Sequence, residues 1–164
     1  MGNYKNFKLV YYFTAQGTAR AEEERLERDI AFFERYMRPD KVYLEPFRGG
    51  VFAGAEQTEL CRRVFERHGV EVAGGLTTTM PTPEGDEPKQ RLLDTLCYND
   101  PKMLAKLSEV CAFLGERFDE FIIDDFFFTN CTCDACRAGK DAYNAEHGIA
   151  DGSWKSIAWI SWSG

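Results

Sequence analysis

The chain has 164 residues, of which 44% are hydrophobic and 29% are charged, a balance typical of one globular domain with a sizeable core. A formal net charge of −7 argues against nucleic acid and against an anionic membrane surface as partners. The N-terminus lacks the apolar stretch of a signal peptide, and no apolar run reaches membrane-spanning length. We therefore expect a cytoplasmic protein whose six cysteines stay mostly reduced.

Segments rich in β-forming residues alternate with stretches of helical periodicity along the chain. The expected strands are residues 9–14, 42–47, 70–79 and 121–128. The expected helices are residues 19–37, 56–68, a stretch opened by residues 98–101, and 135–146. The third helix carries an apolar stripe of Leu104, Leu107, Cys111, Leu114 and Phe118. Strands that alternate with helices predict a parallel sheet with right-handed crossovers.

Four such βα units fit either half of a (β/α)₈ barrel or a small doubly wound sheet. No Gly-rich phosphate loop follows any expected strand, which counts against a nucleotide-binding fold. Long polar loops follow the second, third and fourth strands, as at the active face of a barrel. Since a complete barrel needs about 250 residues, we predict an α/β fold in which residues 1–156 form roughly the first half of a TIM barrel.

The last residues, 157–164, depart from this pattern. All three tryptophans, Trp154, Trp159 and Trp162, come near the end, and no charged side chain follows Lys155. A one-base shift after the codon of Ser156 allows a charged, amphipathic continuation instead. We expect residues 157–164 to be an aberrant, frameshifted tail on a truncated barrel; the alternative is a naturally short protein with an aromatic tail.

The apolar start of the fourth expected strand ends in two adjacent carboxylates, Asp124 and Asp125. Catalytic groups of parallel β/α proteins lie at the carboxyl ends of strands. Because side chains alternate along a strand, the aspartates should face opposite sides, and a catalytic one needs a partner from another strand. Glu45, late in the second strand, is the candidate partner for acid, base or nucleophilic catalysis. The alternative is that one aspartate caps a loop and the other forms a surface ion pair.

Three further side chains are candidates for substrate binding. Arg48 follows Glu45 closely and could either hold that carboxylate as an ion pair or reach a substrate hydroxyl. Tyr98 could stack on a sugar ring, and the neighbouring Asn99 is the third candidate. The threonines at residues 77–79 could line the same end of the sheet. A structural salt bridge for Arg48 and a core position for Tyr98 are the alternatives.

Three cysteines, Cys131, Cys133 and Cys136, follow the fourth strand at close spacing. Such thiolates are typical of a structural zinc site, which needs four ligands in a tetrahedron. Either Cys97 or His147 could supply the fourth ligand. The alternatives are three reduced thiols packed as small apolar residues, or a redox pair formed by Cys133 and Cys136.

Three segments carry a resemblance to a known family: VYLEPFR at residues 42–48, LCYNDP at 96–101 and IDDFFFTNCTCDACR at 123–137. With them the chain resembles a family of largely uncharacterised bacterial glycoside-hydrolase-like TIM-barrel proteins. The resemblance covers most of the chain up to about Ser156 and is carried mainly by the third segment. It implies a (β/α)₈ barrel, carbohydrate as the substrate class, and Asp124 or Asp125 near the sugar.

Three functional hypotheses follow. The first is a glycoside-hydrolase-like protein that needs no cofactor for hydrolysis and is inactive alone because a second catalytic carboxylate is missing. The second is a small zinc-stabilised α/β binding module without catalysis, and the third is a thiol redox protein. Under the first, the ligand is a carbohydrate, and the exposed edges of an incomplete barrel predict self-association.

Overall fold

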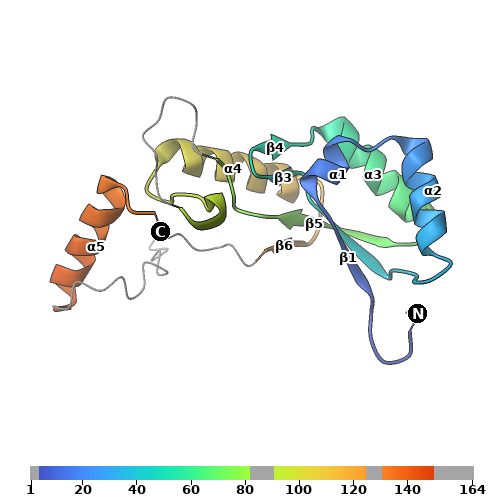
Figure 1. The fold of residues 1–164 in the computed structure, drawn as a ribbon, viewed down its shortest axis with the longest axis horizontal. Coiled ribbons are helices and arrows are strands. Elements are labelled where there is room, and N and C mark those ends of the chain that lie inside the picture. Colours follow the sequence, from blue (N-terminus) through green and yellow to red (C-terminus); the bar gives the residue numbers. More distant parts are fainter. Residues whose placement is uncertain (1–3, 82–90, 125–130, 150–164) are drawn as a thin grey trace.

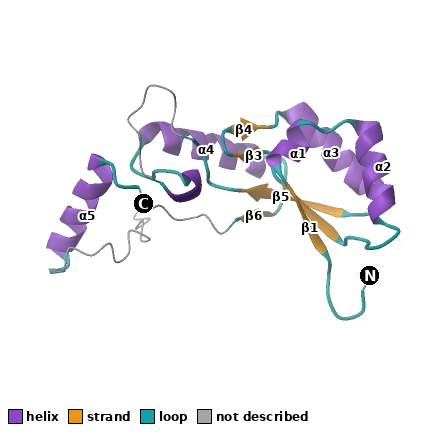
Figure 2. Ribbon diagram, in the orientation of Figure 1, coloured by secondary structure: helices purple, strands orange, loops and turns teal. Residues whose placement is uncertain are grey.

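A computed structural model of the chain describes residues 4–81, 91–124 and 131–149 (Figures 1 and 2). Its strands are β1 (Val10–Phe13), β2 (Lys41–Leu44), β3 (Phe47–Arg48), β4 (Val51–Phe52), β5 (Glu71–Leu76) and β6 (Phe121–Ile123). Its helices are α1 (Ala15–Ala19), α2 (Glu23–Phe33), α3 (Ala55–Arg67), α4 (Pro101–Gly115) and α5 (Asp134–Glu146), with a 3₁₀ turn, η1 (Leu92–Asp94). None of these helices combines the length and the apolar character needed to cross a membrane.

Four parallel strands form the main sheet, in the order β1-β2-β5-β6. This spatial order is also the order along the chain, and every crossover contains at least one helix. Right-handed crossovers in a sequential sheet bring all helices to one face, and Figure 1 shows α1 to α4 on the same side of the strands. The predicted α/β fold of parallel βα units is confirmed.

The main core lies between the sheet and these helices. Val42, Leu44 and Leu76 are fully buried there. They pack in one cluster with apolar side chains of the three longer covering helices: Leu26, Ile30, Val64, Phe65, Val110 and Leu114. Because side chains alternate along a strand, Tyr12, Tyr43 and Gly75 lie on the opposite face, which no described helix covers in Figure 2. In the described part of the chain, the helical core therefore covers only one face of the sheet.

The first expected helix, residues 19–37, is wrong in its bounds, because the structure has two helices there. The short α1 already begins at Ala15, whose backbone N–H donates to the Glu45 carboxylate over 3.0 Å. Thr18 Oγ1 donates to the Glu45 carbonyl oxygen over 2.9 Å. These bonds to a residue far away in the chain hold the first turn in place, and α2 starts separately at Glu23.

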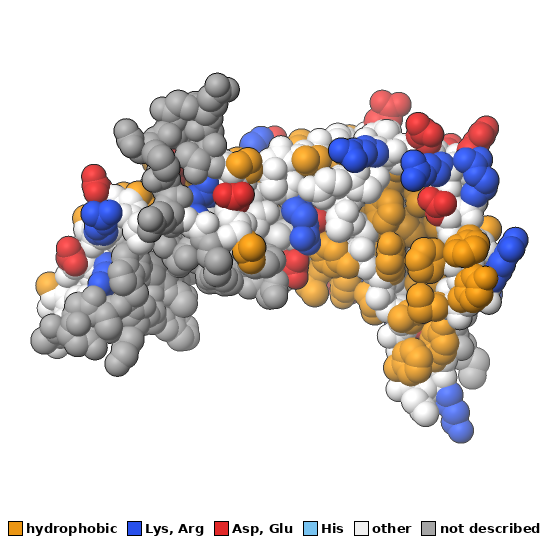
Figure 3. All heavy atoms as spheres, in the orientation of Figure 1, with side chains coloured by type: hydrophobic (Ala, Val, Ile, Leu, Met, Phe, Trp, Pro, Cys, Tyr) orange, Lys and Arg blue, Asp and Glu red, His pale blue; other side chains and the backbone are white. Residues whose placement is uncertain are grey.

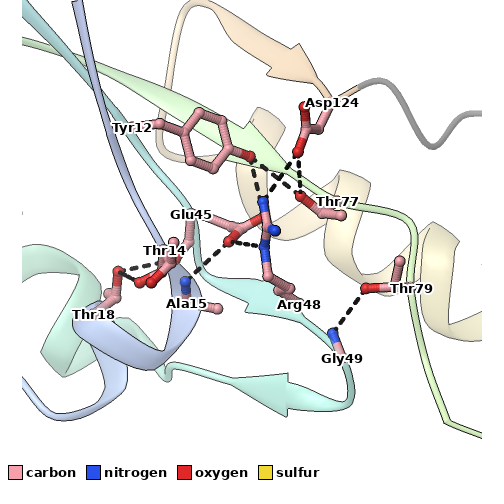
Figure 4. Close-up of polar contacts among 10 residues, drawn as sticks. All are labelled: Tyr12, Thr14, Ala15, Thr18, Glu45, Arg48, Gly49, Thr77, Thr79 and Asp124. Carbon is pink, nitrogen blue, oxygen red and sulfur yellow. Dashed lines mark hydrogen bonds and ion pairs between the residues drawn. The ribbon is translucent and has the colours of Figure 1, made fainter. Parts of the chain in front are cut away.

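The second expected strand, residues 42–47, is also divided. After β2 the chain forms a small hairpin, in which β3 pairs with β4 across Gly49 and Gly50. Both glycines have positive φ, +57° and +78°, as a tight two-residue hairpin turn requires. The Gly49 N–H also donates to Thr79 Oγ1, which ties the hairpin to the segment after β5. The hairpin thereby brings Arg48 to the carboxyl end of the sheet (Figure 4).

The remaining elements follow the prediction with shorter strands. The third strand ends at Leu76, and the fourth covers Phe121–Ile123, while residues 125–128 of its expected range lie outside the described part of the chain. On α4 the fully buried positions are Met103, Val110 and Leu114, whereas Leu104 is 42% exposed. The expected apolar stripe was therefore wrong at Leu104, because the neighbouring Met103 takes the buried position instead.

An apolar groove of about 530 Å³ lies beside β1 and α2. Tyr11, Phe13, Ile30, Phe33 and Met37 are among its lining residues. Phe33 and Met37 are exposed, and Figure 3 shows hydrophobic side chains gathered over this part of the molecule. Within the described sheet β1 is an edge strand, so the groove runs along an unpaired edge.

Candidate functional site

Glu45 lies at the centre of a polar cluster at the carboxyl end of the sheet (Figure 4). It directly follows β2 and is 0% exposed. Its Oε1 accepts a hydrogen bond from the Tyr12 hydroxyl at 3.0 Å. Its Oε2 accepts from the Ala15 N–H at 3.0 Å and from Arg48 Nε at 2.8 Å. A buried carboxylate with three donors is fully compensated, which is the condition for keeping a charge inside a protein.

Arg48 joins this carboxylate to a second one. Its Nη2 donates to Asp124 Oδ2 at 3.0 Å, while Nε is bound to Glu45. The guanidinium also lies 5.6 Å from the centroid of the Tyr12 ring. Burial lowers the pKa of Arg48, but its hydrogen bond to Glu45 and the charge of Glu45 outweigh this, so the pKa is raised. Arg48 therefore stays charged and sets the distance between the two carboxylates.

Asp124 directly follows β6 and is placed by the backbone of β5, because its N–H donates to the Leu76 carbonyl oxygen at 2.8 Å. Its Oδ2 accepts from Thr77 Oγ1 at 3.2 Å, in addition to Arg48. Unlike Glu45, it keeps 32% of its side chain exposed. Of the two carboxylates, Asp124 is thus the one that a ligand can reach.

Tyr12 completes the cluster from β1. Its hydroxyl lies 3.5 Å from Thr77 Oγ1 and donates to Glu45. Burial raises the pKa of Tyr12, and the negative charge of Glu45 adds to this against the opposing hydrogen bond of Thr77. The phenol therefore remains protonated and acts as a hydrogen-bond donor. Side chains from all four parallel strands or their ends meet here, as Figure 4 shows.

The structure brings together three of the candidates, Glu45, Arg48 and Asp124. Tyr98 does not contact them in any described hydrogen bond; its hydroxyl donates to Thr78 Oγ1 at 3.2 Å. Asn99 lies elsewhere, since its Nδ2 donates to Cys136 Sγ at 3.4 Å. Asp125 lies outside the described residues.

Sequence reasoning missed Tyr12 as a member of the cluster. The available signal was its position: it lies two residues before Thr14 at the end of an expected strand. The pleat therefore puts it on the face of the sheet opposite Phe13, whose ring packs against Phe65 of α3. Thr77 was noted only as a possible lining residue, although its place after β5 is equivalent to that of Asp124 after β6.

A cluster of four cysteines lies near the N-terminal end of α4. The sulfurs of Cys97, Cys131, Cys133 and Cys136 all lie within 4.8 Å of one another. Cys97 comes from the loop before α4, and Cys133 is the N-terminal cap of α5. The Cys97 sulfur is 3.8 Å from that of Cys133 and 3.5 Å from that of Cys136. Of the two candidates for a fourth member, the structure brings Cys97 into the cluster.

His147 takes no part in this cluster. It ends α5, where its ring stacks on Tyr143 at 4.0 Å and its Nδ1 lies 2.9 Å from the Tyr143 carbonyl oxygen. None of the six cysteines forms a disulfide, so the four neighbouring sulfurs are not bonded to one another.

The thiols of the cluster differ in their protonation. Burial raises the pKa of Cys97 and raises the pKa of Cys136 to about 11. Burial also acts to raise the pKa of Cys133, but hydrogen bonds from the Cys136 N–H and from the neighbouring thiols outweigh it, and the pKa falls to about 7. Cys133 therefore ionises at a lower pH than Cys97 and Cys136 do.

Comparison with known proteins identifies the family. A model of the family described as "Probable glycosyl hydrolase, catalytic domain" matches residues 1–158. The chain is 30% identical over 147 residues to an uncharacterised protein of the archaeon Saccharolobus solfataricus, in an alignment covering 88% of this chain and 24% of that protein. The chain thus spans about a quarter of the length of this curated relative. No solved structure gives a significant match. The resemblance to glycoside hydrolases is confirmed at this level: the chain belongs to the probable glycosyl hydrolase catalytic-domain family.

Proposed function

We propose that the chain supplies one part of a glycoside hydrolase active site, with Asp124 as the carboxylate that faces the sugar. The observation that carries this proposal is the meeting of Glu45 and Asp124, from different strands, on one guanidinium at the carboxyl end of a parallel sheet. In β/α proteins this end of the sheet is the place of catalytic side chains. Membership of the probable glycosyl hydrolase family supports glycoside hydrolysis as the reaction class.

The two carboxylates have different roles in this proposal. Glu45 is completely buried and its oxygens are taken by three donors, so we assign it the positioning of Arg48 and Tyr12. Asp124 is partly exposed and receives hydrogen bonds from Arg48 and Thr77 on one oxygen, Oδ2. That arrangement suits a base, a nucleophile or an electrostatic stabiliser better than a proton donor.

The charge of the cluster supports the same reaction. Glu45 and Asp124 carry two negative charges against the single positive charge of Arg48, so one net negative charge remains. Glycoside hydrolysis passes through a transition state with oxocarbenium character, which such a charge stabilises. The net charge is also the reason to expect a neutral or cationic ligand rather than a phosphorylated one.

Hydrolysis needs a second carboxyl group, at about 5–5.5 Å for retention or about 6.5–9.5 Å for inversion, with access to the substrate. Buried Glu45 does not meet that need. Asp125 is expected to face the side of the strand opposite Asp124. We therefore propose that the second group comes from further strands of the longer proteins of this family, which close a (β/α)₈ barrel. On its own, this chain should bind carbohydrate with little or no turnover.

The sheet is consistent with such a barrel. A doubly wound sheet reverses its strand order and has helices on both faces, whereas the described strands follow the chain order with helices on one face. In the described part of the chain, the face without helices and the edges at β1 and β6 are the surfaces that closure would cover. Tyr98, bound to Thr78 beside Thr77, remains our candidate for a stacking contact, while Asn99 contacts the cysteine cluster and is assigned none.

Oligosaccharide binding by an Asp124→Asn variant tests the proposal. Isothermal titration would use oligosaccharides of glucose, xylose, galactose and N-acetylglucosamine, with aryl glycosides as a parallel assay for turnover. A charge-assisted hydrogen bond is worth about 1.5–3 kcal/mol, so D124N should weaken binding by about 10- to 150-fold. Asp119→Asn is the matched control, since Asp119 is exposed and comes just before the start of β6, at the other end of the strand from Asp124. Two results would contradict the proposal: a folded wild-type chain that binds none of these sugars, or a D124N variant that binds them as tightly as the wild type does.

A further inference from the structure

We propose that Cys97, Cys131, Cys133 and Cys136 bind one Zn²⁺ ion in a closed, structural tetrahedral site. This inference is independent of the carbohydrate site, because no residue is shared between the two. It links the loop before α4, which carries Cys97, to the start of α5, and it assigns to these cysteines a structural role rather than a catalytic one.

The distances between the sulfurs agree with such a site. A zinc–sulfur bond is about 2.3 Å long, so the sulfurs of an ideal tetrahedron lie about 3.8 Å apart. The two separations from the Cys97 sulfur are 3.8 Å to Cys133 and 3.5 Å to Cys136, and all four sulfurs lie within 4.8 Å. A disulfide would need sulfurs at about 2.05 Å. The thiols are therefore too far apart to be bonded and close enough to share an ion.

The ligand set is also of the right kind. Four cysteine sulfurs with no carboxylate are typical of zinc or iron, whereas calcium and magnesium take oxygen ligands. Cys97, Cys131 and Cys136 are buried and Cys133 is half-buried, which leaves no open position for a substrate. Zinc sites with four protein ligands are structural, and those with an open position are catalytic.

The surroundings offer hydrogen bonds that a negatively charged zinc–thiolate group needs. Asn99 Nδ2 donates to Cys136 Sγ at 3.4 Å. Arg137 follows the last cysteine and is held by a 2.7 Å hydrogen bond from its Nε to the Thr132 carbonyl oxygen. Such contacts orient metal ligands and offset their charge.

The rival explanation is a cluster of reduced thiols that pack as small apolar side chains. The other two cysteines allow a comparison, because Cys61 and Cys111 pack in or against the main core and belong to no such group of ligands among the described residues. The other four come from two segments up to 39 residues apart and still meet at one point. Zinc at that point would fix the loop before α4 to the start of α5, and so anchor the chain seven residues beyond Asp124.

Metal analysis of the untagged 164-residue chain, purified and dialysed without chelator, is the first test. We expect one zinc per chain in the wild type. Cys97→Ser and Cys133→Ser should lower zinc affinity by about 100-fold or more, because each removes one ligand. Cys111→Ser is the matched control and should keep one zinc, since this thiol lies on α4 outside the cluster.

A second measurement keeps the test decisive if a variant fails to fold. The wild-type protein, with zinc bound, is treated with iodoacetamide under native conditions and its cysteines are mapped by mass spectrometry. The four cluster thiols should be protected, and Cys133 should become reactive after zinc is removed with a chelator. Cobalt added to the metal-free protein should give the visible absorption of a tetrahedral thiolate site.

Four results would overturn the proposal. They are a wild-type protein that takes up no zinc, zinc retained by C97S at wild-type affinity, zinc lost from C111S, and stoichiometric iron in place of zinc.

Discussion

Replacing Glu45 by glutamine removes one charge from the buried pair with Arg48 and keeps the shape of the side chain. The amide oxygen can still accept two hydrogen bonds, so the loss is the charge-assisted part of the contacts to Arg48 and the Ala15 N–H. Breaking a fully buried pair costs about 3–5 kcal/mol. Arg48 is 28% exposed and keeps Asp124 as a second partner, so we expect the free energy of unfolding to fall by about 2–3 kcal/mol.

Urea unfolding followed by circular dichroism measures this change. With a urea slope of about 2 kcal/mol per molar, the midpoint should fall by about 1–1.5 M. Melting should occur about 4–12 °C lower. Glu71→Gln is the matched control, because Glu71 also forms an ion pair, with Lys41 at 3.0 Å, but is 56% exposed. Exposed pairs contribute about 0–1 kcal/mol. If E45Q and E71Q cost the same, Glu45 does not hold the site together as described.

Three further predictions follow from the packing, the thiols and the sheet edges. Gly74→Ala should lower the free energy of unfolding by about 1–3 kcal/mol, since the added Cβ would lie 2.9 Å from atoms of both Leu114 and Phe121. Gly115→Ala is the control and should be neutral or stabilising, because the space around Gly115 is open; equal melting temperatures of the two variants would contradict this reasoning. In the metal-free protein, alkylation of Cys133 should speed up as pH rises through about 7, because its thiolate forms above that pKa; a rate that rises only above pH 9 would count against it. The chain should self-associate at micromolar concentration through its open edges, and Phe33→Glu in the groove beside β1 should shift sedimentation towards monomer; a wild-type monomer at all concentrations would refute this.

The order of elements could be predicted from the sequence because each βα unit has its own local signal. The alternation of β-rich segments with helical periodicity is independent of what the chain meets in space. The Gly69 stop after α3 shows this well, since the residue has the positive φ of +72° that such a C-terminal position requires. The strand-end position of Glu45 and Asp124 is also local information.

Other features depend on contacts between distant segments. The start of α1 at Ala15 rests on a carboxylate 30 residues away, which no local pattern reveals. Leu104 and Met103 are both apolar, so periodicity alone does not distinguish which one faces the core. The choice of Cys97 over His147 as the fourth member of the cysteine cluster likewise needed the path of the chain in space.

The proposed carbohydrate site lies at the carboxyl ends of β1, β2, β5 and β6. Photo-crosslinking with a diazirine-bearing oligosaccharide, followed by peptide mapping, tests it most directly and tolerates self-association. Labelled peptides should contain Tyr12, Arg48 or Thr77, and labelling should disappear when the same unmodified oligosaccharide competes. Labelling concentrated on α2 and the groove beside β1, or labelling that free sugar does not reduce, would contradict the claim.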